Sequence, residues 1–258
     1  NIFGLHLTQT QDLSTAKDII NSNGGDWGWV TIVIRLDQLD HQTWQDFFDN
    51  CRKYHLIPIV RLATIADGDN WKIPQESDID NLANFLNSLN WPNKTQHIIL
   101  FNEINHGQEW GGEVDIKSYV DISIYTSQKL KSLNPNFFIL STGLDLASPD
   151  QSPNYLSAET VYQQIFDYKP EYFDNIDGLA SHSYPNHGFV GTPKDTGQHS
   201  IHGYQWELDT IKSLGVKKEL PVFITETGWP HQEGINKKNN FYTTKTTSQF
   251  LLDAYHIW

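Results

Sequence analysis

Two glutamates stand directly after apolar runs that have the character of buried strands. Glu103 follows residues 98–102 and Glu226 follows residues 222–225. A carboxylate at the edge of an apolar core is costly unless it is paired or functional, because burial penalises its charge. Two carboxyl groups that face one site can hydrolyse a glycoside: one protonates the departing oxygen, and the other attacks the anomeric carbon or activates water. The sequence therefore predicts paired carboxylate catalysis.

The elements that must position these glutamates are short β-type runs, each followed by a segment of helical period. Seven such runs start roughly 30 to 45 residues apart, which is the length of a βα unit with its loops. This alternation predicts parallel strands with helices packed outside them. The strands are expected at residues 2–7, 29–36, 56–62, 97–101, 137–141, 176–182 and 221–225. One of the intervening helices is marked by an apolar stripe of Tyr204, Leu208, Ile211 and Leu214.

No linker rich in proline, glycine or serine interrupts this rhythm, so residues 1–258 are interpreted as one catalytic (β/α) barrel domain. An open doubly wound sheet is disfavoured because residues 7–11 offer no glycine-rich phosphate turn after the first strand. The predicted fold is therefore an α/β protein of the eightfold (β/α)8 TIM barrel type. Seven strands cannot close with the shear of eight, so we expect an eighth strand beyond Trp258.

Composition excludes several classes of partner and site. The 258 residues carry a formal charge of −13, which argues against nucleic acid and acidic membranes as partners. No apolar run reaches the length of about 20 residues that a membrane span requires. A single cysteine, Cys51, rules out an intrachain disulfide and a thiolate-rich metal site, and its place on an apolar helical stripe predicts a buried packing residue. Oligomeric state is left open.

Metal binding is also disfavoured among the histidines. Four of them, His182, His187, His199 and His202, match no zinc spacing, and the last three fall in one long loop. The sequence thus predicts no metal and no cofactor.

The context of the glutamates resembles the signature of clan A glycoside hydrolases, which are retaining enzymes on the eightfold barrel. Asn102-Glu103 closes the fourth strand and Glu226 closes the seventh, three βα units later. The resemblance implies an O-glycosyl hydrolase in which Glu226 is the nucleophile and Glu103 is the acid/base. It also implies that Asn102 contacts the 2-hydroxyl of the sugar.

Further positions fit the same resemblance. Arg35 closes the second strand, where clan A enzymes place an arginine beside the nucleophile, and residues 182–184 are similar to a His-x-Tyr element whose tyrosine hydrogen-bonds the nucleophile. With Arg35 and Tyr184 beside it, Glu226 would be ionised at neutral pH. Glu103 would face that negative charge across the cleft, which favours its protonated form and the role of general acid.

Aromatic side chains supply platforms for the apolar faces of sugar rings. Four tryptophans are candidates because they are expected in strand-to-helix loops: Trp27, Trp71, Trp110 and Trp229. Trp229 is preferred because it lies three residues after Glu226, and Trp110 is also assigned to the substrate site.

The expected substrate is a neutral β-glycan, because an acidic surface disfavours uronate-rich polymers. Residues 226–230 are similar to the motif of family 17, the β-1,3-glucanases, while families 5 and 39 stay open, so the activity is that of a β-1,3- or β-1,4-glucanase or a related β-glycosidase. A catalytically silent carbohydrate-binding barrel is the alternative, and a barrel enzyme for phosphorylated substrates is disfavoured because Gly228 alone makes no phosphate site. An extracellular or periplasmic location suits a glycanase, and the sequence leaves it undetermined.

Overall fold

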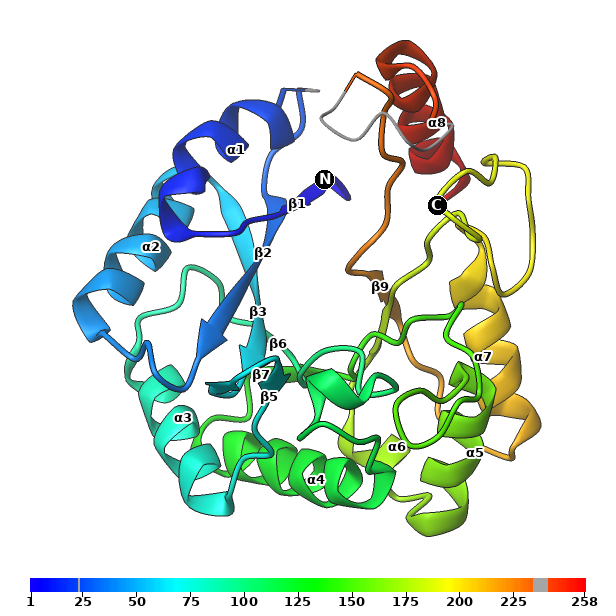
Figure 1. The fold of residues 1–258 in the computed structure, drawn as a ribbon. Coiled ribbons are helices and arrows are strands. Elements are labelled where there is room, and N and C mark those ends of the chain that lie inside the picture. The colour runs from blue at the N-terminus through cyan, green and yellow to red at the C-terminus, as the bar shows by residue number, and fades with distance from the viewer. Residues whose placement is uncertain (23, 234–240) are drawn as a thin grey trace.

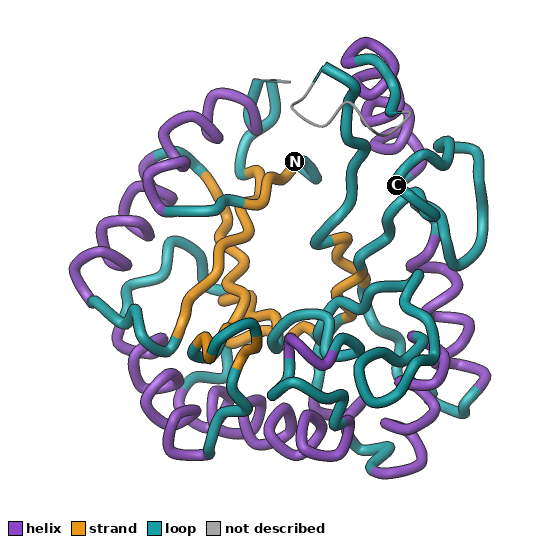
Figure 2. Tube along the Cα trace, in the orientation of Figure 1, coloured by secondary structure: helices purple, strands orange, loops and turns teal. Residues whose placement is uncertain are grey.

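The computed structural model describes residues 1–22, 24–233 and 241–258. Its parallel strands line the inside of the molecule, and the long helices form an outer ring around them (Figures 1 and 2). The barrel strands are β1 (Gly4–His6), β2 (Gly28–Arg35), β3 (Leu56–Ala63), β6 (Gln96–Ile99), β7 (Phe137–Leu140), β8 (Leu179–Ser181) and β9 (Val222–Ile224). Each lies within or overlaps a strand predicted from the sequence.

The strands are hydrogen-bonded in chain order. One sheet has the order β1-β2-β3-β6-β7, and a second pairs β8 with β9. A parallel bridge between Leu140 and Gly178 continues the ladder from β7 toward β8. Every pairing among these seven strands is parallel, so their carboxyl ends all lie at the same end of the barrel. A small antiparallel hairpin of β4 (Ala66–Asp67) and β5 (Asn70–Trp71) rises from the loop after β3.

Most of the described helices cover the strands with an apolar face, because they carry buried residues at three- and four-residue spacing. In α2 the buried residues are Trp44, Phe47, Phe48 and Cys51, which confirms the packing role predicted for this cysteine. Burial raises the pKa of its thiol well above the ordinary range. The long helices are α1 (Leu13–Ile20), α2 (His41–Lys53), α3 (Glu76–Ser88), α4 (Ile116–Leu133), α5 (Ala158–Tyr168), α7 (Gly203–Ser213) and α8 (Thr244–Ile257). Shorter turns are η1 (Thr10–Asp12), η2 (Gly107–Glu109) and α6 (Tyr172–Asn175).

Strands β1 and β9 stand at the two ends of this series, and no strand pairing joins them within the described residues (Figure 1). The rings of Phe3 and Tyr255 stack with their centroids 3.8 Å apart, so α8 packs against the chain that leads into β1. The expected eighth strand between β9 and β1 stays a prediction. Among the described helices, none has the length and apolarity that crossing a bilayer requires.

Candidate active site

The two glutamates predicted from the sequence meet at the carboxyl end of the barrel. Glu103 lies in the loop after β6, where its backbone N–H donates to the carbonyl of Gly143 at 3.0 Å. Glu226 follows β9, whose pairing with β8 continues through a hydrogen bond from the Thr225 N–H to the Ser181 carbonyl at 3.0 Å. One oxygen of each carboxyl group and one ring nitrogen of His182 all lie within 4.8 Å of one another. The strand-end rule thus placed both side chains in one cluster.

His182 is the side chain that connects the two carboxyl groups. Its Nδ1 lies 2.8 Å from Oε1 of Glu103, and its Nε2 lies 3.8 Å from Oε1 of Glu226. Burial alone would lower the pKa of this imidazole, which is only 2% exposed, but the charges of Glu226 and Glu103 outweigh burial and raise it. The imidazole therefore favours its protonated form between the two carboxyl groups.

Gly143 leaves the space that this imidazole occupies. A Cβ atom at position 143 would lie 2.3 Å from both Cδ2 and Nε2 of His182, which is far inside van der Waals contact. The ring stands against the bare backbone of the loop after β7, so a glycine is required here for close approach rather than for an unusual φ.

Glu226 is surrounded by groups that favour its ionised form. NH1 of Arg61 lies 4.0 Å and Nδ1 of His6 lies 3.7 Å from its Oε1, while the Tyr184 hydroxyl donates to Oε2 at 3.2 Å. Burial alone would raise the pKa of this carboxyl, but His182, Arg61, His6 and the Tyr184 hydroxyl together lower it. The predicted contact between Tyr184 and the second glutamate is present.

Arg35 does not occupy the predicted position beside Glu226. Its guanidinium donates two hydrogen bonds to Asp37, from Nε at 2.9 Å and from NH2 at 2.5 Å, and lies over the ring of Trp71 at 5.4 Å. Among the described residues no ion pair joins it to Glu226, and Arg61 of β3 is the arginine found there. The register explains the difference: Arg35 pairs with Ala63, so it lies two residues farther along the barrel than Arg61, which pairs with Val33.

Two of the four predicted tryptophan platforms are core residues. Trp229 is 5% exposed, donates from Nε1 to the Gly191 carbonyl and packs on Phe250 of α8. Trp110 is 1% exposed and packs edge-on against Phe101. Both side chains pack in the interior, and their assignment to the substrate site stays a prediction.

The remaining two tryptophans lie at opposite ends of the barrel. Trp27 precedes β2, which places it at the amino ends of the strands, and there it stacks on His55 with a centroid separation of 4.8 Å. Only Trp71, half-buried in β5, lies beside the reaction centre.

Asn102 is held between two residues with an unusual backbone. Phe101 and Glu103 have φ values of 67° and 34°, a region that residues with a Cβ rarely adopt. Such conformations cost free energy and persist where the surrounding structure enforces them, often at functional sites. Asn102 lines a cavity of about 190 Å³, which Arg61 also lines. Its predicted contact with a sugar hydroxyl stays a prediction.

A metal ion is an alternative occupant to consider, because Glu103, His182 and Glu226 offer three donor atoms at short range. Arg61 and His6 also face the Glu226 oxygen, and a guanidinium at 4.0 Å repels a dication from that position. Two other histidines of the predicted group, His187 and His199, contact each other with ring centroids 4.3 Å apart. The donor set therefore fits proton chemistry better than metal binding.

The sequence analysis missed three residues that surround this centre. His6 ends β1 and obeys the same strand-end rule as the glutamates, so that rule alone could have found it. Arg61 is a charged residue inside an otherwise apolar strand, which was also a visible signal. Glu207 of α7 is fully buried and accepts hydrogen bonds from the hydroxyls of Tyr162, at 2.6 Å, and Ser181.

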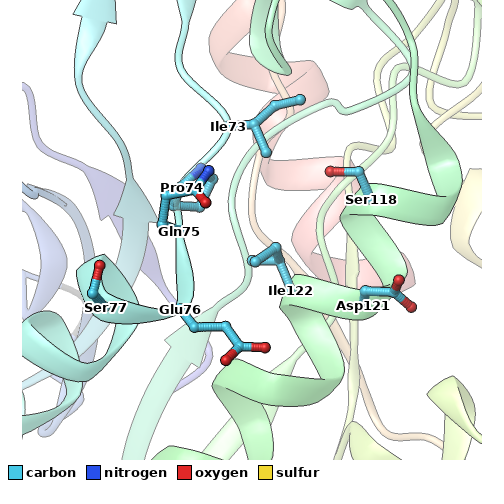
Figure 3. A pocket seen from close by; sticks show the side chains of 8 residues that line it. All are labelled: Ile73, Pro74, Gln75, Glu76, Ser77, Ser118, Asp121 and Ile122. Carbon is cyan, nitrogen blue, oxygen red and sulfur yellow. The ribbon is translucent and has the colours of Figure 1, made fainter.

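A second hollow lies away from the reaction centre. It has a volume of about 590 Å³ and lies open between α3 and α4 (Figure 3). Its lining includes Glu76, Asp121 and Ile122, and contains neither glutamate of the active site.

Comparisons with known proteins identify the fold. No model of a known protein family matches the chain, and no curated protein sequence matches it. Solved structures do match it: a β-1,4-mannanase of glycoside hydrolase family 113 has a TM-score of 0.57 at 10% identity over 99% of this chain and 84% of that one. A family 5 endoglucanase from Clostridium acetobutylicum has a TM-score of 0.55 at 15% identity over 98% and 84%.

A glucosidase from Croceicoccus marinus has a TM-score of 0.55 at 8% identity over 81% of this chain, which spans 47% of the length of that protein. These likenesses confirm the TIM barrel predicted from the sequence.

Proposed function

We propose that this chain is a retaining β-glycoside hydrolase that cleaves a neutral β-glycan by double displacement. The observation that carries the proposal is the approach of the two carboxyl groups, which bring one oxygen each within 4.8 Å of the other. Inverting enzymes keep their carboxyl groups about 6.5 to 9.5 Å apart to admit a water between them, whereas retaining enzymes keep them at about 5 to 5.5 Å.

The neighbours of each carboxyl group support the division of roles. Glu226, with its pKa lowered by His182 and Arg61, attacks the anomeric carbon while the bond from that carbon to the leaving oxygen breaks. Glu103 gives its proton to that oxygen and becomes a carboxylate, which the Nδ1–H of His182 can stabilise by a hydrogen bond. In the second step Glu103 removes a proton from water, the water oxygen bonds to the anomeric carbon, and the ester to Glu226 breaks.

The solved structures with the same fold support the class of substrate. Their names describe a glucosidase, a β-1,4-mannanase and an endoglucanase, and all of these act on glycosides. The formal charge of −13 favours a neutral glycan over a uronate polymer. We propose β-1,3- and β-1,4-glucans and β-mannan as the substrates to test first.

Two measurements test the proposal. A proton NMR time course of hydrolysis is expected to show the β-anomer as the first product, and an α-anomer would refute retention. Glu226→Gln should abolish turnover of all substrates, whereas Glu103→Gln should slow poor leaving groups far more than 4-nitrophenyl glycosides. Equal losses on both substrate types would contradict the assigned roles, and binding of oligosaccharides with no hydrolysis would show a silent carbohydrate-binding barrel instead.

A further inference from the structure

The carboxyl group of Glu207 lies on the buried face of α7, and no step of the proposed catalytic cycle uses it. Its exposed fraction is 0%. Oε1 accepts a hydrogen bond from the hydroxyl of Tyr162 on α5 at 2.6 Å, and Oε2 accepts one from the hydroxyl of Ser181 at the end of β8. A buried carboxyl group carries a desolvation penalty that an apolar side chain would avoid, so a role beyond filling space is indicated.

The hydrogen bonds that begin at Glu207 continue along the end of β8. The hydroxyl oxygens of Ser181 and Ser183 lie 2.7 Å apart, and both residues are fully buried. The Ser183 oxygen also accepts a hydrogen bond from the backbone N–H of Tyr204, in the first turn of α7, at 3.0 Å. Helix α7 therefore holds two alternate residues of this strand end.

His182 lies between these two serines in the chain and faces the other way. Side chains alternate between the two faces of an extended segment, so the serines face α7 while the imidazole faces the glutamates. The ring lies 2.8 Å from Glu103 with Nδ1 and 3.8 Å from Glu226 with Nε2. A shift of the strand end would therefore move the imidazole relative to both carboxyl groups.

The same two serines also hold the segment that carries Glu226. The Ser181 carbonyl accepts a hydrogen bond from the Thr225 N–H at 3.0 Å, and the Ser183 carbonyl accepts one from the Thr227 hydroxyl at 2.8 Å. Thr225 and Thr227 are the two chain neighbours of Glu226. The serines thus connect α7, through their side chains, to both sides of the proposed nucleophile, through their carbonyls.

We infer that Glu207 is a positioning residue: through the hydroxyls of Ser181 and Ser183 it fixes the end of β8. The strand end in turn holds His182 against the two glutamates. The inference rests on the proposed glycosidase function and adds to it a residue that acts through its neighbours rather than on the substrate. The hydrogen bond from Tyr162 to the same carboxyl group joins α5 to α7, so it contributes to helix packing and not to the placement of β8.

Ser181→Ala and Tyr162→Phe form a matched pair, because each removes one hydrogen bond to the same buried carboxyl group. The substrates are 4-nitrophenyl β-glucoside and β-mannoside and cello-, laminari- and manno-oligosaccharides. Ser181→Ala should lower kcat about 10- to 100-fold and change KM less than about threefold, because a small displacement of catalytic groups costs rate more than binding. Tyr162→Phe should lower the urea midpoint to a similar extent and leave kcat at the wild-type value.

Glu207→Gln tests the same connection from the other side. Glutamine keeps the size of the side chain but replaces one acceptor oxygen by a donor, so it should share the loss of kcat seen in Ser181→Ala. The double variant of Ser181→Ala and Glu207→Gln should lose little more than either single variant, because both act through one contact. Losses that multiply would contradict the inference.

An NMR titration of His182 separates failure of this inference from failure of the proposed function. With carbon-13-labelled histidine, the pKa of His182 should fall by at least about 0.5 pH unit in Ser181→Ala, because the displaced ring interacts less with Glu103, and stay unchanged in Tyr162→Phe. This result would support the positioning role even if the wild type hydrolyses no glycoside, which would refute the proposed function alone. If glycosides are hydrolysed and Ser181→Ala affects kcat and the pKa of His182 no more than Tyr162→Phe does, the positioning role is wrong and the glycosidase assignment stands.

Discussion

The pH dependence of catalysis should depend on His182. This imidazole has a raised pKa, so it is cationic throughout the acid range in which Glu226 titrates. Among the groups that lower the pKa of Glu226, His182 has the largest effect. His182→Asn removes the charge and keeps an amide that can hydrogen-bond Glu103. With the cation gone, the pKa of Glu226 rises, so the acid limb of kcat/KM, which requires the ionised nucleophile, moves to higher pH.

The size of this change follows from the distance between the charges. At 3.8 Å from the Nε2 of His182 to the Oε1 of Glu226, two unit charges interact by about 4 kcal/mol at an effective dielectric constant of about 20, and by about 1 kcal/mol in bulk water. A change of one pH unit corresponds to about 1.4 kcal/mol, so the loss of this interaction energy should move the acid limb of kcat/KM up by about 1 to 3 pH units.

The assay is a profile of kcat/KM from pH 3 to 8 with an activated aryl glycoside. His97→Asn is the control, because burial lowers the pKa of this histidine to about 4 and no carboxylate among the described residues contributes to that shift. Its acid limb should coincide with that of the wild type, whatever activity is lost to packing. An unchanged acid limb in His182→Asn would refute the electrostatic role of the imidazole.

Three further variants test separate parts of the structure. Arg61→Lys should lower kcat/KM by about tenfold or more, because an ammonium does not reproduce the guanidinium beside Glu226. Arg35→Lys should change kcat/KM by less than about threefold, because it alters an ion pair with Asp37 and a contact with the Trp71 ring and no contact with Glu226. Gly143→Ala should lower kcat by about 100-fold with the fold intact by circular dichroism, because its Cβ displaces the His182 ring. Burial raises the pKa of the native Glu207 carboxyl to about 7, so the free energy of unfolding of the wild type should fall by on the order of 3 kcal/mol between pH 4.5 and 7. Glu207→Gln should remove this fall. Equal urea midpoints for the wild type at pH 5 and 7 would contradict this prediction.

The strands and both glutamates could be predicted because they follow from local rules. Parallel strands with covered faces are continuous apolar runs, and their carboxyl ends gather at one end of the barrel whatever the loops do. Glu103 and Glu226 therefore had to be neighbours once the strand series was recognised.

The choice of arginine could not be predicted, because it depends on strand register. On both strands the arginine is flanked by buried residues, so the burial pattern alone does not distinguish Arg35 from Arg61. The pairing of β2 with β3 does distinguish them, because Ala63, and not Arg61, lies opposite Arg35. Arg35 is thereby displaced two residues, or about 6.6 Å, along the barrel relative to Arg61. A resemblance between sequence motifs does not give the register in which two strands pair.

The packing of Trp229 and the burial of Glu207 could not be predicted from the sequence for other physical reasons. Trp229 follows β9 in the chain, but its ring packs on Phe250 of α8, and this contact is not local in sequence. Glu207 lies on the buried face of α7 between Tyr204 and Ile211, where a pattern that counts only apolar residues passes over a carboxyl group. Its hydroxyl partners come from other elements of the fold.

The single imidazole between two carboxyl groups also accounts for how the proposed cycle keeps its charge constant. Before the first step Glu226 is the carboxylate, and the proton on His182 faces it at 3.8 Å. In the glycosyl-enzyme Glu226 is a neutral ester and Glu103 has become the carboxylate, now 2.8 Å from the other nitrogen of the same ring. The negative charge moves across the imidazolium, which therefore needs neither to gain nor to lose a proton. Among the described residues Arg61 and Tyr184 are additional partners of Glu226, and this asymmetry supports the proposal that Glu226 is the nucleophile.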